Sequence, residues 1–512
     1  MSFLKKTQLG ALITAVCATS SAFAQDAISW ENADLHTATL IMSEPMMKVN
    51  GGYHELLDAY YLKPLMTKDK LVTAPLDDIL DELNGEMSFD GKKVTYRIND
   101  KVVIMTLGST DALVNGEKVT SPIAPSLIEE ALYVPFRFVF EGLGAKYAWN
   151  SKRSLAEITI LRPAGSIYKP SKGNISIKTI HKQAANWYAS DEAKSVAEAM
   201  LANQNKDGGW FKLGSSSDLS VAYNRDTFPT YRQKSTIDND ATFLQIETLA
   251  KVNQHHSDER YQKSIIRGVE FLIKGQYSSG GWPQFFPQTR GYHSHITFND
   301  NAIANTLSIL RAVANNEAEF QFISADLAKR AESAMQKGVR FVLDNQVVVN
   351  GNKTGWCAQY NAETLACERG RSYELASISG DESVKVIKFL MSINQPSAEV
   401  IDAINSAVAF LQSQQIIDKK ILNVKDDTLQ FGKNRLVVDK KGSVVWPRFI
   451  DIETLKPLFS NRQGDRLETY EQVSYERRVK YNWLVTSPKK LLANAYPVWQ
   501  AKYSVDNNVL AK

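Results

Sequence analysis

The sequence contains very little cysteine and, after its first 24 residues, no long hydrophobic run. Only three cysteines occur among 512 residues, of which 44% are hydrophobic and 23% charged, as in an ordinary soluble globular protein. The formal net charge of +4 is too small to indicate nucleic-acid binding by itself. The missing hydrophobic runs exclude a transmembrane segment in the rest of the chain, and nothing in the composition indicates disorder.

Residues 1–24 have the pattern of a secretory signal peptide. A basic start, an apolar run and an Ala-x-Ala cleavage site follow one another at Lys5-Lys6, Leu9 to Ala18 and Ala22-Phe23-Ala24. We therefore expect a mature chain that starts near Gln25 and is secreted or periplasmic. Its charge falls to about +2 without the two lysines.

The mature chain keeps two cysteines, Cys357 and Cys367. They lie ten residues apart, in a compartment that permits disulfides, and could close a small loop. The sequence leaves the bonded and the free state equally open.

Residues 36–165 predict a small β-rich domain. Short alternating runs such as Val94 to Ile98 are separated by turn signals such as Asp90-Gly91 and Asn115-Gly116, which indicates hairpins. The stretch from Leu132 to Lys146 resembles the stalk-like domain at the N-terminus of copper amine oxidases. We expect no copper site, since the segment has no His or Cys cluster, and we expect a role in binding or spacing.

Pro163, Gly165, Pro170 and Gly173 mark a linker, and a repeat follows in residues 170–512. Helix ends with a nearby Gln recur about every 70 residues, at Gln204, Gln276, Gln346 and Gln414. Each repeat holds about two amphipathic helices. We therefore predict a mainly α protein: an α/α toroid catalytic domain preceded by the small β-rich domain.

Two oxygen-rich triplets stand at the start of helices in this region. Asp238-Asn239-Asp240 precedes one apolar helical face, and Asn299-Asp300-Asn301 precedes another. A single triplet is most simply a helix cap. Two such triplets brought together would suit a hard cation such as calcium, which binds about six to eight oxygens and accepts water and substrate among them.

Gly-Trp turns follow three of the four helix ends, at Trp210, Trp282 and Trp356. The simplest interpretation is structural, with Gln capping a helix end and Trp packing over it. In a toroid, however, these loops gather beside the acidic triplets. We therefore predict that the three tryptophans line a groove that binds sugar faces.

Residues 188–505 resemble the pectate lyases of polysaccharide lyase family 10. Seven blocks carry the resemblance, in the family's order: Asn203-Gln204 with Gly208-Gly209-Trp210, Thr236 to Thr242, Gly281-Trp282-Pro283-Gln284, Ser294 to Ala302, Trp356-Cys357-Ala358-Gln359, Arg371 to Leu375, and Arg448-Phe449 with Asp451. The resemblance implies an α/α toroid. It also implies a secreted, monomeric enzyme that cleaves polygalacturonate (pectate) with the help of calcium.

The resemblance further assigns roles to individual residues. It makes Asp238, Asn239 and Asp300 the site for calcium and the substrate carboxylate, Arg371 the catalytic base, and Arg448 a substrate-binding arginine. Around Arg371 the chain departs from the family pattern, because it has Tyr360-Asn361 and Cys367-Glu368-Arg369-Gly370 where many members differ. Arg369 is therefore a rival candidate for the base.

The chemistry of pectate cleavage explains why such groups would be needed. β-Elimination removes the C5 proton beside an ionised carboxylate, and the resulting anion needs a Lewis acid to stabilise it. Asp238 and Asp300 supply negative charge for a cation, while the planar Arg448 can bind a uronate carboxylate. An arginine base is unusual, because arginine is normally protonated.

Two other functions remain open from the sequence. The chain could be a non-catalytic glycan-binding protein of the cell surface, in which the triplets only cap helices. The repeat of Gln and Gly-Trp also resembles terpene cyclases built on α/α barrels, although a secreted chain with calcium-type triplets fits that class poorly.

Overall fold

The structure is a computed structural model that describes residues 33–42, 46–50, 52–55, 63–128, 131–163, 172–223, 233–287, 291–429, 432–462 and 464–510. The predicted signal peptide, residues 1–24, lies outside the described residues, as do Gly165 and Pro170 of the predicted linker.

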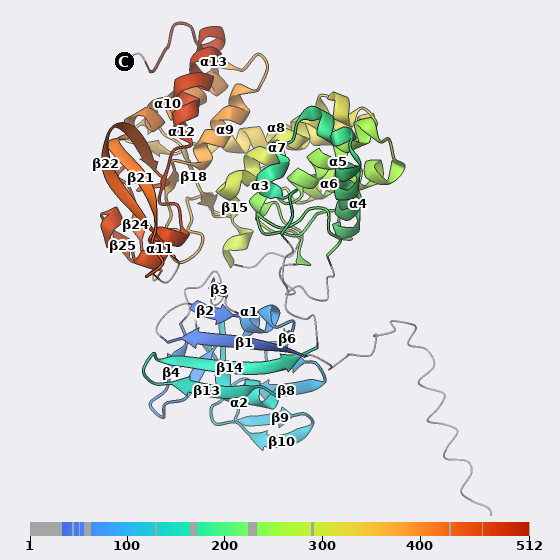
Figure 1. The fold of residues 1–512 in the computed structure, drawn as a ribbon, viewed down its shortest axis with the longest axis vertical. Coiled ribbons are helices and arrows are strands. Elements are labelled where there is room, and N and C mark those ends of the chain that lie inside the picture. Colours follow the sequence, from blue (N-terminus) through green and yellow to red (C-terminus); the bar gives the residue numbers. More distant parts are fainter. Residues whose placement is uncertain are drawn as a thin grey trace, which may run out of the picture.

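The N-terminal part consists mainly of antiparallel strands (Figure 1). Its three sheets have the strand orders β13-β14-β1-β2-β3, β10-β9-β8-β7-β6 and β11-β12-β5-β4. The strands are β1 (Asp34–Ile41), β2 (Met46–Val49), β3 (Gly52–Glu55), β4 (Leu65–Met66), β5 (Val72–Ala74), β6 (Glu86–Phe89), β7 (Lys93–Ile98), β8 (Lys101–Thr106), β9 (Asp111–Val114), β10 (Glu117–Thr120), β11 (Ser126–Ile128), β12 (Ala131–Pro135), β13 (Lys146–Asn150) and β14 (Leu155–Arg162), and the helices are α1 (Asp77–Glu82) and α2 (Phe136–Gly142).

Local sequence accounts for this β-rich part, which confirms that prediction. In β7 the side chains of Val94, Tyr96 and Ile98 are buried while the residues between them are not, as alternation requires. The predicted turn at Asn115-Gly116 joins β9 to β10, and both residues have positive φ, 53° and 89°. Asn and Gly tolerate this backbone, which matches the twist of a hairpin.

Helical pairs dominate the first half of the C-terminal part. The helix α5 packs on α6, α7 packs on α8, and α9 packs on α10. The first helices of these pairs also contact one another, since α7 lies against both α5 and α9. The helices are α3 (Ile177–Ile180), α4 (Asp191–Asn203), α5 (Phe243–His255), α6 (Glu259–Lys274), α7 (Ala302–Ala314), α8 (Ala325–Asp344), α9 (Glu382–Met391), α10 (Ala398–Ser413), α11 (Tyr475–Lys480), α12 (Pro488–Lys490) and α13 (Tyr496–Tyr503).

The repeated glutamines connect one helical pair to the next. Gln276 Nε2 donates to Gly280 O and to Ala334 O, both at 2.8 Å, and so joins its own turn to α8. The same two-fold donation occurs at Gln204, to Gly208 O and Ser264 O, and at Gln346, to Thr354 O and Ala403 O. The repeat in the sequence is therefore a device that aligns neighbouring helices.

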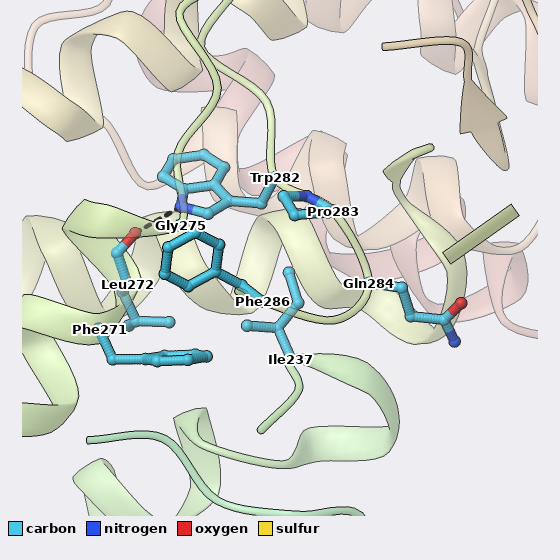
Figure 2. A pocket seen from close by; sticks show the side chains of 8 residues that line it. All are labelled: Ile237, Phe271, Leu272, Gly275, Trp282, Pro283, Gln284 and Phe286. Carbon is cyan, nitrogen blue, oxygen red and sulfur yellow. Dashed lines mark hydrogen bonds between the residues drawn. The ribbon is translucent and has the colours of Figure 1, made fainter. Parts of the chain in front are cut away.

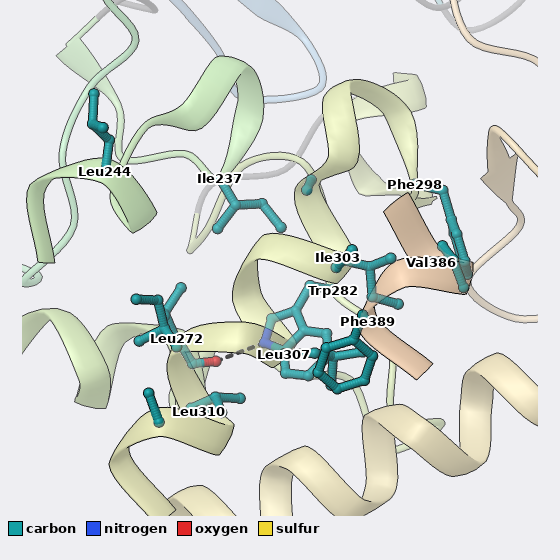
Figure 3. Packing of buried hydrophobic residues seen from close by; sticks show 14 of the residues in the cluster. Ile237, Leu244, Leu272, Trp282, Phe298, Ile303, Leu307, Leu310, Val386 and Phe389 are labelled. Atoms are coloured by element: carbon teal, nitrogen blue, oxygen red, sulfur yellow. Dashed lines mark hydrogen bonds between the residues drawn. The ribbon is translucent and has the colours of Figure 1, made fainter. Parts of the chain in front are cut away.

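The three repeat tryptophans lie in the core rather than in a groove, so their predicted sugar-binding role is wrong. Trp210, Trp282 and Trp356 are at most 1% exposed, and an indole without an exposed face cannot stack on a sugar. Each indole N–H donates to a helix carbonyl, that of Met200, Leu272 or Val342, at 2.6–2.7 Å. Figure 3 shows Trp282 packed among apolar side chains that include Leu307 and Phe389.

The predicted mainly α fold with an α/α toroid is also wrong. Helices account for 37% of the chain and strands for 27%, and strands continue through the C-terminal part. The helical repeat ends at α10, where the side chain of Gln414 donates to the hydroxyl of Ser413, at 3.4 Å, and to no helix carbonyl of the described residues. A long antiparallel hairpin, β21 with β22, then replaces the next helical pair (Figure 1).

The strands of the C-terminal part are short except for β21 and β22: each of the others has two residues. The strands are β15 (Ile296–Thr297), β16 (Val348–Val349), β17 (Asn352–Lys353), β18 (Trp356–Cys357), β19 (Gln359–Tyr360), β20 (Ile378–Ser379), β21 (Ile416–Lys425), β22 (Lys433–Pro447), β23 (Phe449–Ile450), β24 (Phe459–Ser460), β25 (Arg466–Leu467) and β26 (Leu484–Val485). Cys357 and Cys367 form a disulfide, with 5.7 Å between their Cα atoms. It closes the loop that leads to Arg371.

Among the described residues, none of the helices combines the length and the apolar character needed to cross a membrane.

We predict that Gln276→Ala lowers the free energy of unfolding by about 1–2 kcal/mol, because it leaves two carbonyls without their donor. Urea denaturation of the full chain measures this change. Gln414→Ala is the matched control, since its amide makes only the long local contact, and we expect a change below about 0.5 kcal/mol. Equal effects of the two substitutions would contradict the aligning role of the repeat glutamines.

Candidate active site

The two oxygen-rich triplets form two turns of the same backbone shape. Each is a single 3₁₀ turn, η4 (Asp238–Asp240) before α5 and η6 (Asn299–Asn301) before α7, and the two turns contact each other. Asn239 and Asp300 occupy equivalent positions, with φ values of 50° and 49°. Asn and Asp are the residues that best tolerate this left-handed backbone after glycine. The turns therefore aim their polar side chains toward one another.

Asp238 is the most deeply buried carboxylate of this site. Its side chain is 2% exposed, and its Oδ2 accepts a hydrogen bond from Lys212 Nζ. Burial acts to raise the pKa of Asp238, but the Lys212 ammonium outweighs it and holds this pKa below its usual range. Its other oxygen, Oδ1, is buried and meets no hydrogen-bond donor from the described residues. This oxygen therefore lacks the partner that buried polar atoms normally have.

Asp300 faces Asp238 from the second turn. Its Oδ2 accepts hydrogen bonds from the side-chain amides of Asn239 and Asn299, each at 3.1 Å. Desolvation, followed by repulsion from Asp238, raises the pKa of Asp300, while Arg448 opposes the rise. Since 37% of the Asp300 side chain remains exposed, an incoming molecule can reach this carboxylate.

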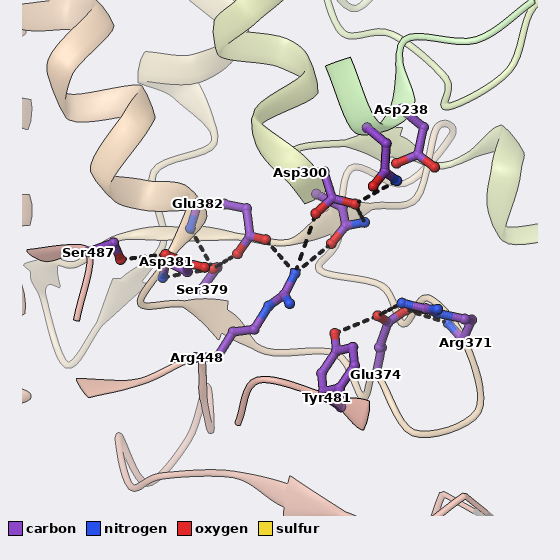
Figure 4. A network of polar contacts seen from close by, with 12 residues as sticks. Asp238, Asp300, Arg371, Glu374, Ser379, Asp381, Glu382, Arg448, Tyr481 and Ser487 are labelled. Carbon is purple, nitrogen blue, oxygen red and sulfur yellow. Dashed lines mark hydrogen bonds and ion pairs between the residues drawn. The ribbon is translucent and has the colours of Figure 1, made fainter. Parts of the chain in front are cut away.

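Arg448 stands on the other side of Asp300, in the network of Figure 4. Its Nη2 donates to Glu382 Oε1 at 2.7 Å and to Asn299 Oδ1 at 3.1 Å, and lies 4.0 Å from Asp300 Oδ1. Glu382 is the first residue of α9 and its side chain is 4% exposed. Burial acts to lower the pKa of Arg448, but Glu382 outweighs it and keeps this arginine protonated.

Arg371 forms a second ion pair beside this network. Its Nε and Nη2 donate to the two carboxylate oxygens of Glu374, at 3.0 and 2.6 Å, and Tyr481 also donates to Glu374, at 2.6 Å. Burial acts to lower the pKa of Arg371, but Glu374 outweighs it, so the pKa lies well above its usual value. About a third of the Arg371 side chain, 35%, is exposed. The rival Arg369 is more exposed.

The structure thus gathers the predicted polar residues in one place. Asn239, next to Asp238 in the chain, donates to Asp300, and Arg448 lies against Asp300. The Tyr481 ring connects the two arginines, since its centroid is 5.0 Å from Arg448 Cζ and 5.7 Å from Arg371 Cζ.

The sequence did not reveal three members of the site: Lys212, Glu382 and Tyr481. Lys212 stands two residues after Trp210, outside the motif that contains this tryptophan. Glu382 and Tyr481 stand in no motif, and they meet their partners across 66 and 107 residues of chain. Only the fold brings these pairs together.

The residues present fit an open cation site rather than a closed one. Within the described residues, no group of three or more His, Cys, Asp or Glu side chains is arranged to hold a metal ion. Asp238 and Asp300 nevertheless offer oxygen ligands, one of which is buried and lacks a donor. A hard cation would therefore take its remaining ligands from water and substrate.

A small apolar pocket lies next to the first turn (Figure 2). Its lining includes Ile237, Phe271, Trp282 and Phe286, and its free volume of about 10 Å³ has room for little more than one water molecule. None of its lining residues is charged, so the pocket is unsuited to an acidic sugar.

Comparisons with protein families agree with this site. A sequence model of pectic acid lyase matches residues 204–492, which include both turns and both arginines. A model of the copper amine oxidase N-terminal domain matches residues 50–158. A search among curated proteins finds no match.

Two solved structures of a family 10 polysaccharide lyase from Cellvibrio cellulosa are similar to this chain. One, a variant in complex with trigalacturonic acid, has 33% sequence identity and a TM-score of 0.54, and the match covers 61% of this chain and 96% of that one. The other has 31% identity and a TM-score of 0.53, with 67% and 99% covered. The chain therefore belongs to the pectic acid lyase family and is a polysaccharide lyase.

Proposed function

We propose that this chain is a pectate lyase that cleaves polygalacturonate by calcium-assisted β-elimination. The observation that carries the proposal is the contact between the turns that bear Asp238 and Asp300, with Asn239 donating to Asp300 and Arg448 beside it. The trigalacturonic acid bound to the similar Cellvibrio enzyme supports the choice of substrate. Membership of a lyase family also favours this function over a non-catalytic glycan binder or a terpene-cyclase-like enzyme.

In this mechanism Asp238, Asn239 and Asp300 hold the cation and the substrate together. Calcium bound there would neutralise the uronate carboxylate and stabilise the anion that develops when C5 loses its proton. Arg448 orients the substrate through a carboxylate, and Glu382 keeps its guanidinium in place.

We further propose that Arg371 receives the C5 proton. The electron pair of the C–H bond then forms the C4–C5 double bond, the C4–O bond breaks, and water protonates the leaving oxygen. Glu374 opposes the first step, because it stabilises the protonated guanidinium. It also fixes the orientation of Arg371 through two hydrogen bonds, so the same contact both positions the base and raises its pKa.

Export remains part of the proposal, as does a monomeric state. The leader of residues 1–24 would carry the enzyme to the periplasm or the medium, where pectate is found. Mass spectrometry of the mature protein tests this: it should begin near Gln25.

We predict that removal of divalent ions abolishes cleavage and that added calcium restores it, because Asp238 and Asp300 are too few ligands for a closed site. The ultraviolet absorbance of unsaturated uronides, followed with pectate before and after chelation, measures this. Full activity after exhaustive chelation, with no metal left in the protein, would exclude the cation from the mechanism.

We predict that Arg371→Lys is nearly inactive although it keeps the charge, because an ammonium cannot reproduce the planar geometry of the guanidinium. The loss should appear in kcat, by about 100-fold or more, with little change in KM. Arg369→Lys is the matched control, and we expect it to stay within a few-fold of the parent. The reverse order of the two effects would make Arg369 the base.

We predict that Glu374→Gln moves the rising limb of the pH–rate profile to lower pH by about one unit. Glu374 raises the pKa of Arg371, so its neutralisation lowers that pKa and the unprotonated base forms at lower pH. The other groups facing Arg371, namely Tyr373, Tyr481 and Arg477, are unchanged.

Glu476→Gln is the control for this shift, because Glu476 pairs with Arg462 and Arg477 rather than with Arg371. We expect its pH limb to stay where the parent has it. If the rising limb of the pH–rate profile stays in place in Glu374→Gln, Arg371 does not titrate as the base, whatever the maximum rate of the variant.

A further inference from the structure

Lys212 forms an ion pair with Asp238, a carboxylate that the proposed cation needs as a ligand. Its Nζ donates to Asp238 Oδ2, and the two side chains differ sharply in exposure, 43% for Lys212 and 2% for Asp238. The carboxylate is thus fixed in the wall of the site while the ammonium approaches it from the solvent side. Of the two partners, only Lys212 has room to move away.

The backbone next to Lys212 is held firmly. Trp210 N donates to Thr242 Oγ1 at 3.0 Å, and Phe211 forms a β-bridge with Ser235. Any displacement of the ammonium must therefore occur by rotation of the long lysine side chain, not by movement of the loop.

The charges around Asp238 determine whether the Lys212 ammonium or a divalent ion binds to it. A divalent ion and an ammonium bound to the same carboxylate oxygen would repel each other at close range. The second carboxylate, Asp300, lies near Arg448, which already pairs with Glu382, so no other fixed cation neutralises Asp238 among the contacts of the described residues.

We propose that Lys212 is a built-in counter-cation, which stabilises Asp238 in the metal-free enzyme and is displaced from it when calcium binds. This inference rests on the proposed function, because it assumes a cation at Asp238. Calcium affinity then includes the cost of breaking the Lys212–Asp238 pair.

The exchange also prepares the site for its substrate. Asp238 and Asp300 carry two negative charges when both are ionised. In the metal-free site Lys212 offsets one of them and the Arg448–Glu382 pair adds none, so the site keeps one negative charge that repels a uronate carboxylate. Calcium would offset both charges and remove this repulsion, so calcium would precede the substrate.

Calcium titration of full-length Lys212→Met in the absence of substrate tests the proposal. The apparent Kd, taken from the calcium dependence of Tm, should fall by about 10-fold or more relative to the parent, because calcium no longer competes with an ammonium. In chelator, the Tm of the variant should lie below that of the parent, since Asp238 has lost its partner. An unchanged or weaker calcium affinity would overturn the displacement.

Two further variants complete the experiment. Lys251→Met breaks a lysine–carboxylate pair with Glu247 inside α5 that involves neither Asp238 nor Asp300, and it should leave the calcium Kd unchanged. Lys212→Arg keeps a competing cation, so an affinity about 10-fold above that of the parent would contradict the proposal even if the methionine variant fails to fold. If the parent binds no calcium and cleaves pectate in chelator, the proposed function itself is refuted; if the parent binds calcium and Lys212→Met does not bind it more tightly, only this inference is.

Discussion

The repulsion between the carboxylates of Asp238 and Asp300 is the constraint on which the arrangement of the other site residues depends. Each carboxylate is surrounded by groups that compensate its charge: Lys212 for the first, two amides and Arg448 for the second. Ionising both of these neighbouring carboxylates costs free energy, because their like charges repel, unless a cation binds between them. Among the described residues, the side-chain cations next to the two carboxylates are Lys212 at Asp238 and Arg448 at Asp300. The position between the carboxylates is therefore the one that a divalent ion would stabilise most.

The backbone makes this arrangement possible before any side chain contributes. In both turns the second and third residues adopt positive φ, and in both they are Asn or Asp. A left-handed backbone conformation costs free energy, and Asn and Asp are among the few side chains that reduce this cost. The helices α5 and α7 start directly after the turns and are packed side by side, so the repeat that aligns the helices also aligns the two turns. The glutamine contacts that align successive helical pairs thereby also help to set the distance between the carboxylates.

The sequence predicts the parts of the site that depend on local pattern and misses those that depend on distant contacts. The triplets are readable because Asn and Asp before an apolar helical face have few alternatives. Trp282 was misjudged because a tryptophan after two glycines can point outward or inward, and the hydrogen bond to Leu272 O that decides the matter leaves no trace in the sequence. The toroid was wrong for a related reason. The periodic glutamines do not indicate that the helical repeat stops after Gln414, where strands β21 and β22 follow.

Tyr481 determines how binding and reaction would be linked in the proposed mechanism. Its ring lies against both guanidinia, and its hydroxyl donates to the carboxylate that holds Arg371. A guanidinium beside an aromatic ring is favoured in its charged form, so the ring stabilises both arginines as cations. Arg448 needs that charge to bind a uronate, whereas Arg371 must lose it to accept a proton. The two arginines share one ring, and each pairs with a buried carboxylate, Glu382 at 4% and Glu374 at 7% exposed. They differ in their own exposure, which is 10% for Arg448 and 35% for Arg371. The greater exposure of Arg371 allows solvent to take up its proton, and this difference makes Arg371 rather than Arg448 the better candidate for the base.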